Sequence, residues 1–287
     1  AVMLIDNYYM GWMIAIFTFL FFLWQTPALA SWRQRGVIFL RYLSSSLLAA
    51  GISAVILLPT FYALMQSKGT YTETKIHSRF EYFAPKMLGK LVPGSFNFNQ
   101  MPSGQPNIYI GMLLMLGACL YFFNNRFDLR RRLIGAAISI FFIFSFCYEP
   151  LDLLWHAGQF PVWYPYRFSY LFSFWCIYLA AKVLQPDFKI KKRSAMILTL
   201  LIIAVYWYVG TLNLSYINSN QRNIGLCFAL IAVSCLCIPR TNSPRLYDAL
   251  LVLLAVCDIS MSGYTALNKI SYVSQPEFGN YTLALDK

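Results

Sequence analysis

Residues 195–212 read AMILTLLIIAVYWYVGTL, and none of these side chains carries a charge. A helix needs about 20 mostly apolar residues to cross the ~30 Å hydrocarbon core of a bilayer. Seven further stretches are dominated by apolar residues in the same way, at 8–24, 37–62, 108–123, 133–148, 168–184, 224–238 and 246–262. The sequence therefore predicts an all-α polytopic transmembrane bundle of about eight spans.

The composition of the whole chain agrees with this class of protein. Of 287 residues, 59% are hydrophobic and 12% are charged, against about 25% charged in an ordinary soluble domain. The mean hydropathy is +0.54, which excludes a soluble globular protein. Disordered chains are charged and poor in aromatic residues, so the 18% of aromatic residues excludes disorder.

Basic residues alternate from one side of the predicted bundle to the other. The four short connections, 25–36, 124–132, 185–194 and 239–245, hold 12 Lys and Arg in 38 residues, whereas the alternate connections and the tail hold 9 in 100. Because cytoplasmic loops are enriched in Lys and Arg, we expect the short connections to be cytoplasmic. The net charge of +12 then reflects topology, and no nucleic-acid partner is indicated.

This orientation predicts two long extracytoplasmic loops, at 63–107 and 149–167. Residues 1–262 form one transmembrane domain, and 263–287 begin a C-terminal extracytoplasmic region. The partner implied directly is a lipid bilayer, crossed several times. The chain begins at Ala1 without a signal peptide, so it reads as an internal piece of a longer protein.

The first long loop contains apolar residues near helical spacing over 80–91, which predicts a short amphipathic helix on the outer interface with Lys86 and Lys90 toward the head groups. That helix either gates a lipid-facing cavity or only stabilises the interface. In the second loop, Arg167 precedes the fifth span. Its side chain suits a phosphate or pyrophosphate, because the planar guanidinium group can donate two parallel hydrogen bonds to two phosphate oxygens. The alternative is that Arg167 reaches a lipid phosphate.

Other ionisable residues carry weaker signals. His156 is one of two histidines, and no metal site or cofactor is predicted. The seven cysteines lie in apolar stretches as buried hydrophobic residues. Asp258 lies near the outer end of the eighth span, where it is either functional or turned outward.

Several short motifs, in this order and spacing, resemble the YfhO family of bacterial membrane proteins. The resemblance extends over about residues 5–275. The motifs are Asn7-Tyr8-Tyr9-Met10-Gly11, Leu58-Pro59, Pro106-Asn107-Ile108-Tyr109-Ile110-Gly111, Trp155-His156, Pro161 and Pro165-Tyr166-Arg167-Phe168-Ser169.

The resemblance implies a GT-C-like fold and a glycosyltransferase activity. Such an enzyme takes a sugar from a polyprenyl-phosphate carrier on the outer face and transfers it to a cell-surface polymer or lipid, such as a teichoic acid. Full-length members begin with a further span and an acidic outer loop. The resemblance therefore implies that the general base lies upstream of Ala1, and that residues 1–287 alone transfer no sugar.

A donor of this kind needs cations for its phosphate, and a sugar needs aromatic and amide partners. The available outer cations are Arg167, Arg79, Lys86 and Lys90. Candidates for the sugar or acceptor are Asn107, Tyr109, Trp155 and Trp163. Candidates for acid or base chemistry within the chain are Glu81, Glu149, Asp152 and His156.

Two other classes of function stay open from the sequence. A transporter or lipid flippase would place functional charges near the bilayer midplane and usually shows inverted repeats, which the sequence lacks. A non-catalytic membrane assembly factor would have no defined phosphate site.

Overall fold

A computed structural model describes residues 1–26, 31–66, 75–161, 163–185, 188, 190–238 and 244–270. Within these residues the chain is helical, and the only pairing of strand type is an isolated antiparallel bridge between Phe80 and Tyr148. The predicted C-terminal region from 271 onward lies outside the described residues.

Helices form at all eight predicted places. Their bounds are α2 (Tyr8–Gln25), α3 (Trp32–Gln66), α5 (Met112–Phe123), α6 (Leu129–Ser145), α8 (Ser169–Val183), α9 (Lys192–Thr211), α10 (Ser219–Cys237) and α11 (Pro244–Leu267). Short elements are added at α1 (Val2–Asp6), α4 (Gln100–Ser103) and α7 (Glu149–Trp155). The short helix predicted over 80–91 is present as the 3-10 helix η3 (Ala84–Leu91). The all-helical class is thus confirmed.

Five of these helices, α2, α3, α9, α10 and α11, are long and apolar enough to cross a membrane. Helices α5, α6 and α8 have 12, 17 and 15 residues, fewer than the ~20 that a full span requires. The number of eight spans therefore stays a prediction. The short pair α5 and α8 packs closely, since a Cβ at Gly117 would lie 3.0 Å from the Cβ of Ala180.

The third predicted span begins later than expected, because residues 108–111 are not helical. Gly111 has φ of 88°, a conformation that favours glycine. The first turn of α5 is capped from another helix: the Met112 N–H donates to Asp258 Oδ2 at 2.6 Å, and the Tyr109 hydroxyl donates to Oδ1. Asp258 is 2% exposed, so its side chain does not turn outward. It accepts a hydrogen bond from a backbone N–H at the start of α5, where the first N–H groups of a helix have no partner within the helix.

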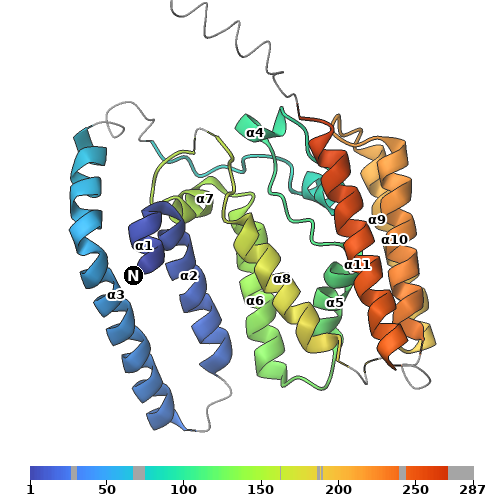
Figure 1. Ribbon diagram of the computed structural model, residues 1–287, viewed down its shortest axis with the longest axis horizontal. Helices are drawn as coiled ribbons and strands as arrows, with labels where there is room; N and C mark the ends of the chain where they lie inside the picture. The colour runs from blue at the N-terminus through green and yellow to red at the C-terminus, as the bar shows by residue number, and fades with distance from the viewer. Residues whose placement is uncertain are drawn as a thin grey trace, which may run out of the picture.

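The helices pack as two clusters that meet along α5. One cluster joins α2, α6, α7 and α8 and is rich in aromatic rings, and the other joins α5 with α9, α10 and α11. Helix α3 stands at the edge of the bundle (Figure 1), and among its described side chains only Ser53 is buried. Its apolar surface is therefore left for lipid or for other protein.

The arrangement separates two ends of the bundle. Figure 1 shows α2, α5, α8 and α10 ending toward the lower edge, where α3, α6, α9 and α11 begin, while α4 and α7 lie at the upper edge. The basic residues Arg130, Arg131, Lys192 and Arg193 belong to the lower helix starts. The polar loops and the basic runs thus lie at opposite ends, as the charge count predicts.

We expect the end with Arg131 to face the cytoplasm and the end with Gly94 to face outward, because basic loops are retained inside. The measurement is labelling of single introduced cysteines by an impermeant thiol reagent in intact cells, in a background without the seven native cysteines. A cysteine at Ser103, which is exposed, should label, and one at Asn125 should label only after lysis. The reverse pattern would invert the topology.

Candidate functional site

The acidic candidates from two distant loops meet at the end of the bundle opposite the basic helix starts (Figure 1). We expect this end to face outward and call it the outer end. The backbone of the first loop pairs with the start of α7: the Glu81 N–H donates to the Cys147 carbonyl at 2.9 Å, and the Glu149 N–H donates to the Arg79 carbonyl at 3.2 Å. This short pairing places Arg79 and Glu81 beside Glu149. We call the set Glu81, Glu149, Asp152 and His156 the α7 cluster.

Helix α7 places three members of this cluster through simple local rules. Pro150 lies in its first turn, where a missing N–H has no cost. Glu149 and Asp152 occupy the same turn, where the helix dipole favours acids. The helix ends at His156, and Gly158, with φ of 80°, donates its N–H back to the Leu153 carbonyl at 2.8 Å.

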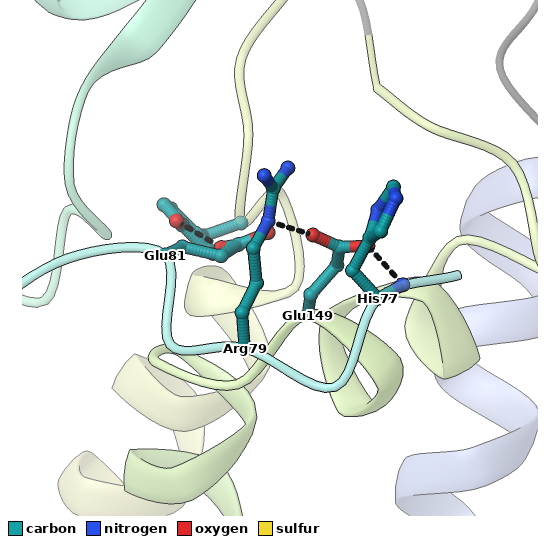
Figure 2. A network of polar contacts seen from close by, with 5 residues as sticks. His77, Arg79, Glu81 and Glu149 are labelled. Carbon is teal, nitrogen blue, oxygen red and sulfur yellow. Dashed lines mark hydrogen bonds and ion pairs between the residues drawn. The ribbon is translucent and has the colours of Figure 1, made fainter. Parts of the chain in front are cut away.

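Glu149 is a buried carboxylate with a complete set of partners. It is 1% exposed. Its oxygens accept from the His77 N–H at 2.8 Å and from Arg79 Nε at 2.6 Å (Figure 2). Burial alone would raise the pKa of Glu149, but the His77 N–H and the Arg79 guanidinium outweigh it and lower that pKa. Glu149 is therefore an ionised structural acid that is held in place.

Arg79 keeps part of its binding capacity. Its side chain is 63% exposed, and its two terminal nitrogens point away from Glu149 in Figure 2. A guanidinium has five N–H donors. The bond through Nε thus leaves the outer edge of Arg79 available to an anion.

Glu81 lies at the surface of the same cluster. The Tyr166 hydroxyl donates to Glu81 Oε2, and the residue is exposed. Burial of part of its carboxyl raises the pKa of Glu81, and the charge of Glu149 adds to this effect, while the bond from Tyr166 opposes it. A carboxylate with a raised pKa and access to the outside suits general-base chemistry near neutral pH.

Asp152 and His156 form the deeper pair of the cluster. They are 2% and 0% exposed, and Asp152 Oδ1 lies 3.4 Å from His156 Nε2. Burial, with the charges of Glu81 and Glu149, raises the pKa of Asp152 to about 8. Burial, with the charge of Arg167, lowers the pKa of His156 to about 4. Near neutral pH the pair is therefore a protonated carboxyl beside a neutral imidazole.

Arg167 lies beside this pair at the outer end of α2 and α8. Its guanidinium carbon is 5.3 Å from the ring centre of Tyr9 and 5.9 Å from that of Tyr164, and Nη2 donates to the Trp163 carbonyl at 2.8 Å. The Tyr9 hydroxyl shares a hydrogen bond with His156 Nδ1. Tyr9 therefore connects the buried histidine to the exposed arginine.

The loop before α8 is held in a strained conformation. Tyr164 and Tyr166 have φ of 53° and 59°, which costs ~1–3 kcal/mol for each non-glycine residue. Two contacts hold them: the Tyr164 N–H donates to the Met101 carbonyl at 2.7 Å, and Tyr166 is bonded to Glu81. Strain of this kind clusters at functional sites, and here it positions Arg167.

An apolar groove runs below Arg167 between α2 and α8. Its volume is about 410 Å³. From α2 and α8 it is lined by Ile14, Phe17, Thr18, Phe21, Tyr170, Leu171 and Phe174. Arg167 lies two residues before the start of α8, and Tyr170, which lines the groove, is in the first turn of that helix. The arginine therefore stands at the outer end of the groove.

Two candidate residues lie in places that the sequence did not predict. Lys90 is 1% exposed, so the expectation that it faces lipid head groups is wrong; Lys86 on the same 3-10 helix is exposed. Trp155 is 0% exposed and stacks on Phe168 with ring centres 4.7 Å apart, so it is a core residue with no face for a sugar. Trp163 is 45% exposed.

The structure thus divides the predicted residues between two locations. Arg79, Arg167 and Trp163 gather with the α7 cluster, whereas Lys90, Asn107 and Tyr109 line a separate cavity near α11. Tyr9 and Tyr166, which contact the cluster directly, were not singled out as site residues. Both lie within the motifs Asn7-Tyr8-Tyr9-Met10-Gly11 and Pro165-Tyr166-Arg167-Phe168-Ser169, so those motifs contained the missing signal.

The fold defines a helical membrane protein with several spans. At one end of its bundle, polar loops and short helices carry most of the candidate site residues. Comparison with protein families gives one match, to the bacterial membrane protein YfhO, over residues 1–287. The chain belongs to this family. Comparisons with curated proteins and with solved structures gave no match.

Replacing Asp152 by asparagine should stabilise the protein at neutral and alkaline pH. In the folded protein the pKa of Asp152 is about 8, whereas in the unfolded chain an aspartate has a pKa of about 3.9. Between these two pH values the unfolded state is stabilised by ionising and the folded state is not. Asp152 therefore lowers the free energy of unfolding more and more as the pH rises from about 4 to about 8. Asp152→Asn should therefore melt close to the wild type at pH 4 and above it at pH 8, measured by thermal unfolding in detergent. A variant that melts below the wild type at pH 8 would show that the ionised carboxylate is needed.

Proposed function

We propose that this protein is a glycosyltransferase of the bacterial plasma membrane that uses a polyprenyl-phosphate-linked sugar on the outer face and transfers the sugar to a cell-surface glycopolymer or lipid. The observation that carries the proposal is Arg167 at the outer end of the apolar groove between α2 and α8. Eight spans and a GT-C-like fold belong to the same proposal.

The groove matches an isoprenoid chain in chemistry and position. All of its lining side chains except Thr18 and Tyr170 are purely hydrocarbon, and the groove follows two helices of the transmembrane bundle. A chain lying there buries apolar surface, and its phosphate would reach the outer end of α8. There the guanidinium of Arg167 forms charge-assisted hydrogen bonds, which are about twice as strong as neutral ones.

The second arginine extends this phosphate site toward the acids. The outer edge of Arg79 faces away from Glu149 (Figure 2). Trp163 is exposed, and its backbone carbonyl accepts from Arg167 Nη2. A planar aromatic face of this kind suits a sugar ring. In this proposal Arg167 and Arg79 hold the phosphate, and Trp163 offers an aromatic surface for the sugar.

Among the described acids of the α7 cluster, Glu81 suits the role of general base best. The ionised Glu149 is paired with Arg79, and Asp152 is buried and protonated near neutral pH. Glu81 would accept the proton of the acceptor hydroxyl as that oxygen bonds to the anomeric carbon. The bond from this carbon to the phosphate oxygen breaks in the same step, and the polyprenyl phosphate leaves with the electron pair beside the arginines.

Arg167→Ala should weaken donor binding by about 1.5–3 kcal/mol, the usual scale for a hydrogen bond to a charged group. Arg167→Lys should restore only part of it, because the planar fork is lost. The measurement is binding of a polyprenyl-phosphate sugar to the purified protein in detergent. The matched control is Arg222→Ala at the outer end of α10, which should bind as the wild type does.

If Arg167→Ala folds and keeps its donor affinity, Arg167 is an interfacial anchor and the donor site lies elsewhere. A protein that binds the donor through Arg167 yet transfers no sugar to any acceptor would instead fit a lipid flippase.

Glu81→Gln should lower sugar transfer by about 10²–10⁴, the usual contribution of a positioned base, while donor affinity stays unchanged. The measurement is transfer from a labelled donor by the complete gene product. Asp128→Asn is the control, because this exposed acid precedes α6 at the opposite end of the bundle. Full transfer by Glu81→Gln would show that Glu81 is not the base.

A further inference from the structure

A second polar cavity lies at the outer end of the bundle, between the first long loop and α11. Its volume is about 240 Å³, far above the ~10–15 Å³ that one water molecule needs. Its lining comprises Lys90, Gly94, Ser95, Phe96, Asn107, Ile108, Tyr109, Ser262 and Ala266. Asn107 is exposed, so the cavity reaches the surface there.

Lys90 is the charged group of this cavity. Its side chain enters the protein from η3, and its Nζ donates to the Ser95 carbonyl at 2.8 Å and to Asn107 Oδ1 at 3.1 Å. The ring of Tyr216 lies 4.8 Å from Nζ. An ammonium group has three N–H donors, so one remains for the cavity.

Within the described part of the chain, Lys90 forms no ion pair with an acid. The acid on the adjoining helix, Asp258, accepts from Tyr109 and from the Met112 N–H. A second lysine, Lys269, lies close by and donates to the carbonyls of Gly94 and Tyr216 and to Gln221 Oε1, at 3.2, 2.7 and 2.9 Å. Two cations therefore share this region.

A buried charge without a counter-charge is unfavourable, because it loses its hydration and gains no ion pair. Burial, together with the charge of Lys269, lowers the pKa of Lys90 to about 7. An anion bound in the cavity would supply the missing charge.

Two further side chains at the cavity each keep a hydrogen-bond donor. The Asn107 oxygen accepts from Lys90, which leaves its NH₂ group. The Ser262 oxygen accepts from the Gly94 N–H at 2.9 Å, which leaves its hydroxyl proton. Donors on three sides of one cavity suit an oxyanion and disfavour a cation.

We propose that the Lys90 cavity is a binding site for the phosphate group of a small polar molecule, held by Lys90, Asn107 and Ser262. This site is distinct from the groove below Arg167, because it is formed by η3, the loop before α5, and α11. The phosphate can come from a free phosphate ester or from a lipid head group, which use the same donors.

The test measures binding to the full chain in a maltoside detergent at constant ionic strength. One arm uses sn-glycerol 3-phosphate, with glycerol as the uncharged control, and the other uses short-chain phosphatidylglycerol. Lys90→Gln should weaken binding in the responding arm by about tenfold or more. Lys75→Gln, an exposed lysine of the same outer loop, should bind as the wild type does.

Asn107→Asp gives a second variant that does not depend on removing the lysine. The new carboxylate would lie against Lys90 and supply the missing charge, so the protein should melt higher without ligand and bind the phosphate probe about tenfold more weakly or worse. Loss of binding in both variants supports the site, and the responding arm identifies the source of the phosphate. Binding in neither arm, or equal affinity in the wild type and Asn107→Asp, overturns the proposal, and neither result depends on sugar transfer.

Discussion

The outer end of this protein depends on the burial of one carboxylate. Glu149 lies 1% exposed at the start of α7, and a buried carboxylate is stable only when charges and hydrogen bonds replace its lost hydration. Its partners, the His77 N–H and Arg79, come from a loop about 70 residues earlier in the chain. Satisfying this charge therefore fixes the path of the loop, and with it the position of Glu81.

The buried ionisable groups divide into three chemical states, and each state corresponds to a different role. Glu149 is ionised and paired, so it supports structure. Asp152 and His156 are held neutral by burial, which lets them lie inside the aromatic core without an ion pair. Lys90 is buried beside the rings of Tyr216 and Phe96 and has no acid partner in the described part of the chain, so the ligand that we propose would supply the missing charge.

The aromatic residues connect the polar end to the membrane. Trp155 stacks between Phe168 and Phe142, with ring centres 4.7 and 5.0 Å apart, and this stack fixes α7 on the ends of α6 and α8. The strained tyrosines before α8 are held against the same surface. Arg167 is consequently rigidly placed at the outer end of an apolar groove, an arrangement that suits a lipid with a charged head.

The sequence by itself determined the class of protein and the positions of its helices, because hydropathy and the bias of basic loops depend only on local composition. It also identified the acids and cations of the polar end. Only the tertiary structure decided that Glu81 lies beside Glu149, that Trp155 is core, that Lys90 is buried, and that α5 begins at Met112 under Asp258. The position of Glu81 and the start of α5 depend on contacts with Cys147 and Asp258, which lie far away in the sequence. Trp155 is buried by Phe142 and Phe168 from neighbouring elements, and no local pattern records which partner removes a side chain from water.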